Sequence, residues 1–388
     1  MALNDVTFVK GQGGLGRPLA GEDHISGFVF YLPSETTVAG FTAGTIKTFY
    51  SIDGLEALGI KSDSTETFTK VVWYHVSEYF RIQPKGVLHV GLFTTPGTFA
   101  DVTTLQNEAL GKIRQVAVYN TANFSATDVA ALQTVANNLA ANHKPLSVLY
   151  AANVSALSAL EAIDLSESTA SNVSVVIGED GAALGKTLAT AASYSITCIG
   201  AALGAVSRAK VSENIGWVKN FNMAGIELDT IAFADGTLYK NVDAGKLDTL
   251  NNNHFIFLRK HVGINGSYFN DTFTAVSETS DYSTIENNRT IDKAIRNVRA
   301  FLLPELNGPL YVTSDGKLSE DTIAYFKSLS GRPLEQMQRD GELSAFGVEI
   351  DPTQDILATS TLNISVKLIP VGVARQIKVN IGFTVKLS

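Results

Sequence analysis

The strongest pattern in the chain is a strict alternation of apolar and polar residues near its C-terminal end. Along residues 376–387 every second side chain is apolar, and most of the residues between them are polar. Between 361 and 369 the same alternation puts Leu362, Ile364, Val366 and Leu368 on one face. A period of two over such lengths predicts β-strands with one buried face. Each of these strands therefore needs a partner strand and an apolar surface to cover it.

Residues 21–200 alternate between short apolar runs and longer segments of helical period. Gly27–Leu32 is fully apolar, and Thr67–Phe80 has apolar residues three and four positions apart. Further strands are expected at 86–93, 115–119, 146–151 and 173–177, and further helices at 99–112, 126–142 and 155–163. Apolar strands separated by helices predict an α/β fold, with a parallel sheet covered by helices. The apolar window at 196–206 is too short to span a bilayer and predicts a buried helix.

The last third of the chain predicts an α+β domain. Strands are expected at 254–259, 268–273 and 345–350, and a helix with one basic face at 283–303. A second helix should start after Ser319, with an interruption at Gly331–Pro333. The predicted division is an N-terminal arm at 1–20, a variable α/β domain at 21–200, a core domain at 201–375 on which parts of 21–60 pack, and a C-terminal strand at 376–388.

The N-terminal segment predicts an arm rather than part of a packed domain. Val6–Lys10 suits a short strand, and the glycine-rich stretch Gly11–Gly16 follows it. Glycines at this density cannot pack a core and form a flexible hinge.

Composition excludes several classes of function. The chain has 30 Lys and Arg against 38 Asp and Glu, a formal net charge of −8, which disfavours binding to nucleic acid. The first residues lack a basic segment followed by an apolar one, so no signal peptide is expected. Cys198 is the only cysteine and the six histidines are scattered, so neither a disulfide nor a metal site is expected.

Two glycine-rich stretches have the spacing of phosphate-binding loops but depart from them in detail. Gly11–Gly16 has the dinucleotide spacing, yet no amphipathic helix follows it. Gly178–Thr187 ends in Gly-Lys-Thr after an expected strand, as a P-loop does, but Asp180 stands where the first glycine belongs. A carboxylate there would repel a phosphate. No catalytic grouping stands out elsewhere, so we assign no catalytic residue or cofactor and expect no enzyme activity.

The two ends of the chain point to assembly. A strand at each end can leave its own domain and add to the sheet of another subunit by β-augmentation. Different ends docking on different neighbours give head-to-tail contacts, which close into rings or extend as helical arrays.

An ordered set of short segments runs through the C-terminal half. It consists of Asn214–Val218, Val262–Phe269, Ser280–Tyr282, Asn288–Asp292 and the strands Val366–Val371 and Gln376–Val385. With these segments, residues 205–388 resemble the contractile tail sheath proteins of myophages and related phage-like contractile injection systems. Residues 21–200 match only as an α/β insertion.

The resemblance implies a structural protein of a bacteriophage or related virion tail, assembled in the cytoplasm of the bacterial host. Such sheaths polymerise into a helical tube around an inner tube and contract to drive it through a cell envelope for genome or effector delivery. The implied partners are copies of this chain, the inner tail tube protein, and baseplate and tail terminator proteins, with no nucleic acid and no membrane insertion.

The resemblance also implies that the terminal arms exchange between subunits and dock on a sheet containing Val348–Ile350 and Leu362–Leu368. The residues expected to take part in exchange are Val6, Phe8, Gly11, Gly13, Gly14, Ile377, Val379, Ile381, Phe383 and Val385. We further predict that Arg289, Arg296 and Arg299 contact the inner tube or a neighbouring subunit. The main alternative is a P-loop-like nucleotide-binding α/β enzyme that uses residues 178–187. A third is a periplasmic-type binding protein, which the missing signal peptide disfavours.

Overall fold

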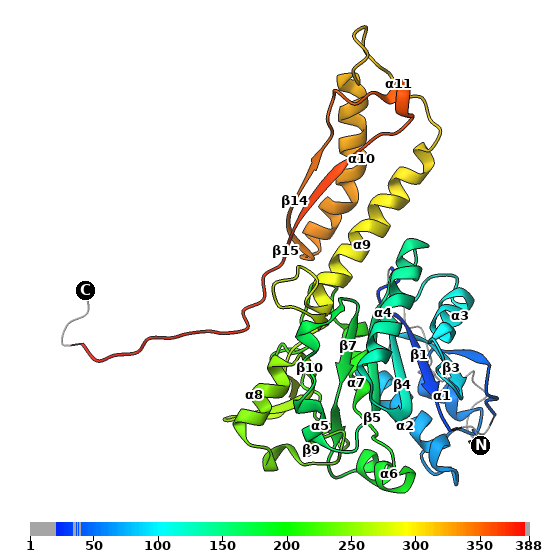
Figure 1. Cartoon of the computed structure of the whole chain (residues 1–388), viewed down its shortest axis with the longest axis vertical. Helices are drawn as coiled ribbons and strands as arrows, with labels where there is room; N and C mark the ends of the chain where they lie inside the picture. Colours follow the sequence, from blue (N-terminus) through cyan, green and yellow to red (C-terminus); the bar gives the residue numbers. More distant parts are fainter. Residues whose placement is uncertain (1–20, 34–35, 37, 39, 385–388) are drawn as a thin grey trace, which may run out of the picture.

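The structure, a computed structural model, describes residues 21–33, 36, 38 and 40–384. A seven-stranded sheet lies at the centre of its larger part, which we call the body (Figure 1). The strand order is β10-β7-β5-β4-β1-β3-β2, and all neighbours are parallel except β2 and β3. The strands are β1 (Ile25–Tyr31), β2 (Ile46–Phe49), β3 (Val87–Phe93), β4 (Gln115–Asn123), β5 (Ser147–Asn153), β7 (Val173–Val176) and β10 (Phe255–Ile256). The predicted α/β fold with a parallel sheet is confirmed, and the sheet draws on the chain as far as Ile256.

Helices cover both faces of this sheet because its strands are apolar on both sides. Phe28 and Phe30 of β1 point to one face and Val29 and Tyr31 to the other. The first face is covered by α1 (Ile52–Glu56), α2 (Thr67–Ile82), α6 (Leu184–Ala192) and α7 (Ile199–Arg208). The second face is covered by α3 (Ala100–Glu108), α4 (Ala126–Ala141), α5 (Leu157–Glu161) and α8 (Ala244–Asn252).

Helix α7 is the buried helix expected from the apolar window. Gly200 lets it lie directly on α2, since a Cβ there would stand 2.3 Å from the carbonyl oxygen of His75. No helix among the described residues is both long enough and apolar enough to cross a membrane.

Short antiparallel pairs and 3₁₀ turns complete the body. The pairs are β6 (Thr169–Ala170) with β13 (Ala275–Val276), β8 (Gly178–Asp180) with β9 (Ile231–Phe233), and β11 (Leu258–His261) with β12 (Ile264–Phe269). The turns are η1 (Leu165–Glu167) and η2 (Tyr239–Asn241).

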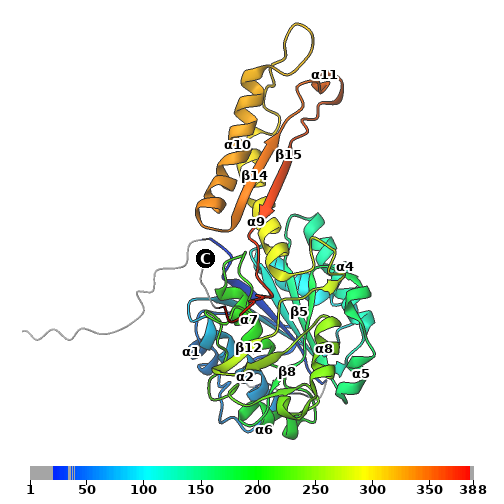
Figure 2. The ribbon, with the colours of Figure 1, turned by 90° about the vertical axis from the view of Figure 1, so that its left-hand side faces the viewer.

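Residues 285–370 form a projecting lobe that stands on the body (Figures 1 and 2). Its first helix, α9, starts among buried residues of the body, including Ile285 and Arg289, and continues outward into the lobe. The lobe contains α9 (Ile285–Leu302), η3 (Leu303–Glu305), α10 (Glu320–Arg339), β14 (Leu343–Glu349), α11 (Ile356–Thr359) and β15 (Ser365–Pro370). Since α9 belongs to both parts, the position of the lobe depends on how this helix is held.

Helix α10 corrects one prediction. It begins after Ser319, whose side chain accepts a hydrogen bond from the Thr322 amide as expected, but it continues without interruption through Pro333. A proline inside a helix costs about 3 kcal/mol because it removes a hydrogen bond and crowds the preceding turn. Here Leu334, the next residue, and Met337, one turn further on, are buried in the lobe core. We attribute the unbroken helix to this packing, which outweighs the local preference.

A charged cluster fixes α9 to the body. The carboxylate of Asp23, just before β1, accepts ion pairs from Lys293 Nζ at 2.7 Å and from Arg296 Nη2 at 3.2 Å. Lys293 also pairs with Glu342 at 2.6 Å, which ties in the turn between α10 and β14. Burial by itself would raise the pKa of Asp23, but Lys293, together with Arg289 and Arg296, outweighs burial and lowers that pKa.

Replacing Asp23 by Asn should destabilise the chain by about 2 kcal/mol at pH 7. The cost lies below the ~3–5 kcal/mol of a fully buried broken pair because the Asp23 side chain is 25% exposed. A carboxylate with a lowered pKa contributes stability above its unfolded-state pKa of about 4 and loses it as the pH falls through the folded-state pKa. The difference between wild type and D23N in urea unfolding should therefore shrink below about pH 4.

The matched control is Glu335→Gln, which removes an exposed (i, i+4) pair with Arg339. We expect it to change the free energy of unfolding by less than about 0.5 kcal/mol. An Asp23→Asn chain as stable as this control would contradict the role given to the cluster.

Candidate assembly interface

A two-stranded antiparallel sheet forms one face of the lobe. Strand β14 pairs with β15 so that Phe346 lies opposite Leu368 and Val348 opposite Val366. These four side chains pack toward a small core containing Ala294 of α9 and residues of α10. No third strand joins this sheet in the part of the chain that the structure describes, so both of its edges are open there.

The sheet is too narrow for the two helices beneath it. Packed helices lie about 8–10 Å apart, whereas neighbouring strands lie about 4.8 Å apart. A layer of two helices therefore matches about four strands, whereas the structure describes only two strands in this sheet. Strand β14 lies over α10, while β15 only approaches α9. Much of the apolar face of α9 is left without a covering strand.

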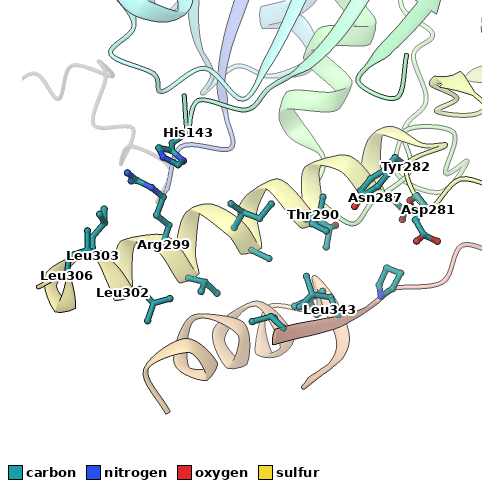
Figure 3. A pocket seen from close by; sticks show the side chains of 17 residues that line it. His143, Asp281, Tyr282, Asn287, Thr290, Arg299, Leu302, Leu303, Leu306 and Leu343 are labelled. Atoms are coloured by element: carbon teal, nitrogen blue, oxygen red, sulfur yellow. Dashed lines mark hydrogen bonds between the residues drawn. The ribbon is translucent and has the colours of Figure 1, made fainter. Parts of the chain in front are cut away.

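A groove of about 780 Å³ occupies the uncovered space between α9 and β15 (Figure 3). Its apolar lining comes from Ile291, Ala294, Ile295, Val298, Leu302, Leu303 and Leu306 on the α9 side, and from Leu343, Val366, Leu368 and Pro370 on the sheet side. Asp281, Tyr282 and Asn287 lie near the start of α9, and Leu303 and Leu306 lie at its other end (Figure 3). Arg299 points from α9 toward His143, on the side of the helix away from Leu343 (Figure 3).

The segment that follows β15 leaves the molecule instead of folding back onto it (Figure 1). Residues 372–384 are exposed, and residues 376–384 adopt no regular secondary structure in this single chain. Ile377, Val379 and Ile381 are 81%, 70% and 91% exposed, and Phe383 is fully exposed. The alternating apolar side chains expected from the sequence are thus exposed, and no other part of the described chain packs on them.

An ion pair between the partly exposed Arg375 and two buried carboxylates fixes the root of this segment to the body, and we call it the Arg375 clasp. The guanidinium of Arg375 donates to Asp271 from Nε at 2.7 Å and from Nη2 at 3.2 Å, and to Glu286 from Nη2 at 2.9 Å. Asn214 Nδ2 donates to the same two carboxylates, at 2.6 and 3.2 Å. Burial raises the pKa of Glu286, although a hydrogen bond from Thr272 and the charge of Arg375 oppose this.

Of the three basic residues of α9 predicted to contact a partner, two bind groups of the body and one lines the groove. Arg289 is buried, and its guanidinium donates to the carbonyl oxygens of Ala209 and Lys210, so it is not available to a partner in this conformation. Arg296 pairs with Asp23. In this conformation neither of them is free to contact the inner tube or a neighbouring subunit as predicted, because acceptors of the body surround the first half of α9. Arg299 lies at the groove, and its contact with a partner stays a prediction.

Several predicted exchange residues lie outside the described part of the chain. Val6, Phe8, Gly11, Gly13, Gly14 and Val385 are in this group. The predicted receiving segments correspond to β14 and β15, although β15 begins at Ser365 and Leu362 packs at the distal core of the lobe.

In the loop with P-loop spacing, Gly178–Thr187, a side chain of the loop itself binds the backbone amides. The Asp180 carboxylate accepts hydrogen bonds from the backbone amides of Ala182 and Ala183 at 3.0 Å and of Gly185 at 2.9 Å. These amides at the start of α6 are the groups that would cradle a phosphate. Asp180 therefore occupies the position that a phosphate would need.

Two features of this interface were not predicted from the sequence. The groove was hidden because it depends on how helices and strands are layered in space. Arg375 gave a signal that could have been used, since it is the only charged residue between β15 and the alternating segment. Within the described residues no group of His, Cys, Asp and Glu side chains gathers to hold a metal ion, and the expectation that none is bound stays a prediction.

Solved structures with the same fold belong to contractile assemblies. The chain aligns with a protein of the anti-feeding prophage (AFP) baseplate at a TM-score of 0.60 and 16% identity, covering 98% of this chain and 100% of that one. It aligns with a protein of the PVC sheath complex, an extracellular contractile injection system in its contracted state, at a TM-score of 0.64 and 11% identity, covering 99% of both chains. A protein of the contracted AFP baseplate gives a TM-score of 0.55 at 14% identity, again over 99% of both chains. At these identities the likeness shows a shared fold.

Sequence comparison identifies the family. No curated protein matches the chain by sequence. The model of the DUF2586 N-terminal domain matches residues 3–273, and that of the DUF2586 C-terminal domain matches residues 281–388. The boundary between the two models falls just before α9, the helix that carries the chain from the body into the lobe. With both domains matched along nearly its whole length, the chain belongs to the DUF2586 family.

Proposed function

We propose that this chain is the sheath subunit of a contractile injection system or phage tail. Copies join head to tail into a helical tube around an inner tube, and contraction of the sheath drives that tube through a cell envelope. The observation that carries the proposal is the coexistence, in one chain, of an uncovered apolar groove and an exposed segment with the alternating pattern of a strand. The shared fold with AFP and PVC components supports the same assignment.

The groove and the C-terminal segment agree in length. The nine described residues 376–384 span about 30 Å as a strand, at roughly 3.3 Å per residue. Helix α9 has 18 residues and is about 27 Å long at 1.5 Å per residue. A strand placed beside β15 would therefore follow the groove over most of the length of α9.

They also agree in chemistry. The open edge of β15 offers unpaired backbone groups to an added strand, and the groove beside it is lined by aliphatic side chains. A strand paired with β15 would turn Ile377, Val379, Ile381 and Phe383 toward this lining and leave Lys378 and Asn380 in solvent. We therefore propose that residues 376–388 of one subunit add to the sheet of the next.

The energetics suit a reversible link. Each fully buried aliphatic or aromatic side chain contributes about 1.5–3 kcal/mol, while ordering each backbone residue costs about 1–2 kcal/mol. One exchanged strand is therefore a modest contact, and many copies in a lattice make a stable one. Because the link is a continuous chain, subunits can rotate between two packings without separating.

A strand donor and a groove on different parts of one chain make a head-to-tail contact, and repetition of that contact extends the array. We propose that the partners are copies of the chain, an inner tube protein, and baseplate and terminator proteins at the two ends of the tail. Arg299, in the last turn of α9, is the remaining basic residue of this helix proposed to face a partner. The sheath needs no nucleotide in this account, because energy is stored in the extended lattice.

Substitutions on the apolar face of the C-terminal segment should abolish tubes and leave the fold intact. Ile377→Asp with Ile381→Asp places two charges in the groove, while both side chains are exposed in the single chain and contribute little to its stability. Negative-stain microscopy should show no tubes, and the melting temperature should stay within about 2 °C of wild type. The matched control, Lys378→Asp with Asn380→Asp, changes the solvent face of the same strand and should still form tubes. Normal tubes from the first variant would contradict the proposal.

The nucleotide alternative has its own test. Asp180 holds the amides at the start of α6, so Asp180→Ala should destabilise the chain by about 1–2 kcal/mol, as loss of a helix cap does. We expect no ATP hydrolysis above background, and no change in it on Lys186→Ala. Turnover that depends on Lys186 would support the enzyme reading instead.

A further inference from the structure

The connection between β15 and the C-terminal segment has the length of a hairpin loop. β15 ends at Pro370, and the alternating segment begins at Gln376, so five residues separate two strands of the same period. Loops of two to five residues commonly join antiparallel strands. Left to itself, this segment would fold back along β15, fill its own groove and close its own sheet.

The Arg375 clasp binds the far end of that loop to the body. Arg375 is the last of the five loop residues, and its guanidinium is bound to carboxylates of two different parts of the body, one on the strand connection at Asp271 and one on α9 at Glu286. Beyond this point the segment runs away from the lobe (Figure 1). A fully extended loop of five residues spans at most about 17 Å, so the place where Arg375 is bound limits where the segment after it can begin.

Two buried carboxylates of the clasp depend on Arg375 for charge compensation. Asp271 and Glu286 are buried, with side chains 9% and 3% exposed, and Arg375 makes all the ion pairs that the described residues offer them. Arg375 itself is 40% exposed, but its removal would leave the two buried carboxylates without a compensating charge, which is unfavourable. Release of Arg375 from the clasp is therefore costly, and the open position of the loop is the stable one.

We propose that the Arg375 clasp forces strand exchange between subunits by preventing each chain from pairing its C-terminal segment with its own β15. This inference rests on the proposed exchange of residues 376–388. A tethered strand has a millimolar effective concentration near its own groove and would outcompete a neighbour's strand if nothing held it back. The clasp thus decides between a closed monomer and an open, assembling one.

Two independent variants test the clasp. The first, Arg375→Gln with Asp271→Asn and Glu286→Gln, removes the ion pair without leaving a buried charge. The second inserts about ten Gly and Ser residues between Arg375 and Gln376, which keeps the clasp and gives the segment enough slack to reach its own groove. The matched control is Arg339→Gln, which removes an exposed pair elsewhere on the lobe.

Both variants should assemble poorly and close on themselves. If nine-tenths of the chains are closed, the protein concentration needed for tubes rises about tenfold. Pyrene attached at Lys367→Cys and Lys378→Cys reports closure as excimer emission that does not depend on protein concentration. Cys198 is buried and does not compete for the label. Labelled chains with the unaltered clasp, and labelled chains with the Arg339→Gln control substitution, should give no such emission as dilute monomers.

Assembly of both variants at the wild-type concentration, without concentration-independent excimer, would overturn the role of the clasp. That result is distinct from failure of strand exchange itself, in which wild type lacking residues 376–388 would still form tubes. If only the insertion variant closes, the loop is held open by contacts other than the ion pair, which also overturns the proposal.

Discussion

The mismatch between two helices and two strands in the projecting lobe is the constraint on which the rest of this structure depends. Helices α9 and α10 form a layer wide enough for about four strands, whereas β14 lies over α10 and β15 only approaches α9. The uncovered side of α9 becomes an apolar groove next to an open strand edge. A groove of this kind is a hazard in an isolated protein and a specific docking site in an assembling one.

Charged clusters fix to the body the elements that would carry mechanical force if a neighbour's strand docked in the groove. Asp23, Lys293, Arg296 and Glu342 join α9 and the α10–β14 turn to the body, so the receiving lobe has a fixed base. The Arg375 clasp fixes the donating segment to the same body through Asp271 and Glu286. The proposed donor and receiver are thus anchored on one α/β unit, and we expect a pull on the C-terminal segment of a chain to pass to its body through the Arg375 clasp.

Features set by local period could be predicted from the sequence, and features set by layering could not. The parallel sheet, the buried α7 and the alternation at 376–384 follow from spacing along the chain. The unbroken α10 was predicted wrongly, because packing of Leu334 and Met337 is a tertiary effect that outweighs the preference of Pro333. The inward position of Arg289 depends on carbonyl groups of residues 209 and 210, which no pattern near residue 289 reveals. The same holds for the groove, which exists only where α9 and β15 diverge.

The most direct test of the account is complementation between two chains that are each unable to polymerise. One chain carries Ile295→Arg, which places a charge in the groove at a side chain already 53% exposed, and keeps its C-terminal segment. The other lacks residues 376–388 and keeps its groove. The account predicts that neither forms tubes alone and that a mixture gives a one-to-one complex in analytical ultracentrifugation, because one donor meets one acceptor. A mixture in which both chains stay monomeric would contradict strand exchange into the groove, and so would tubes formed by the Ile295→Arg chain alone.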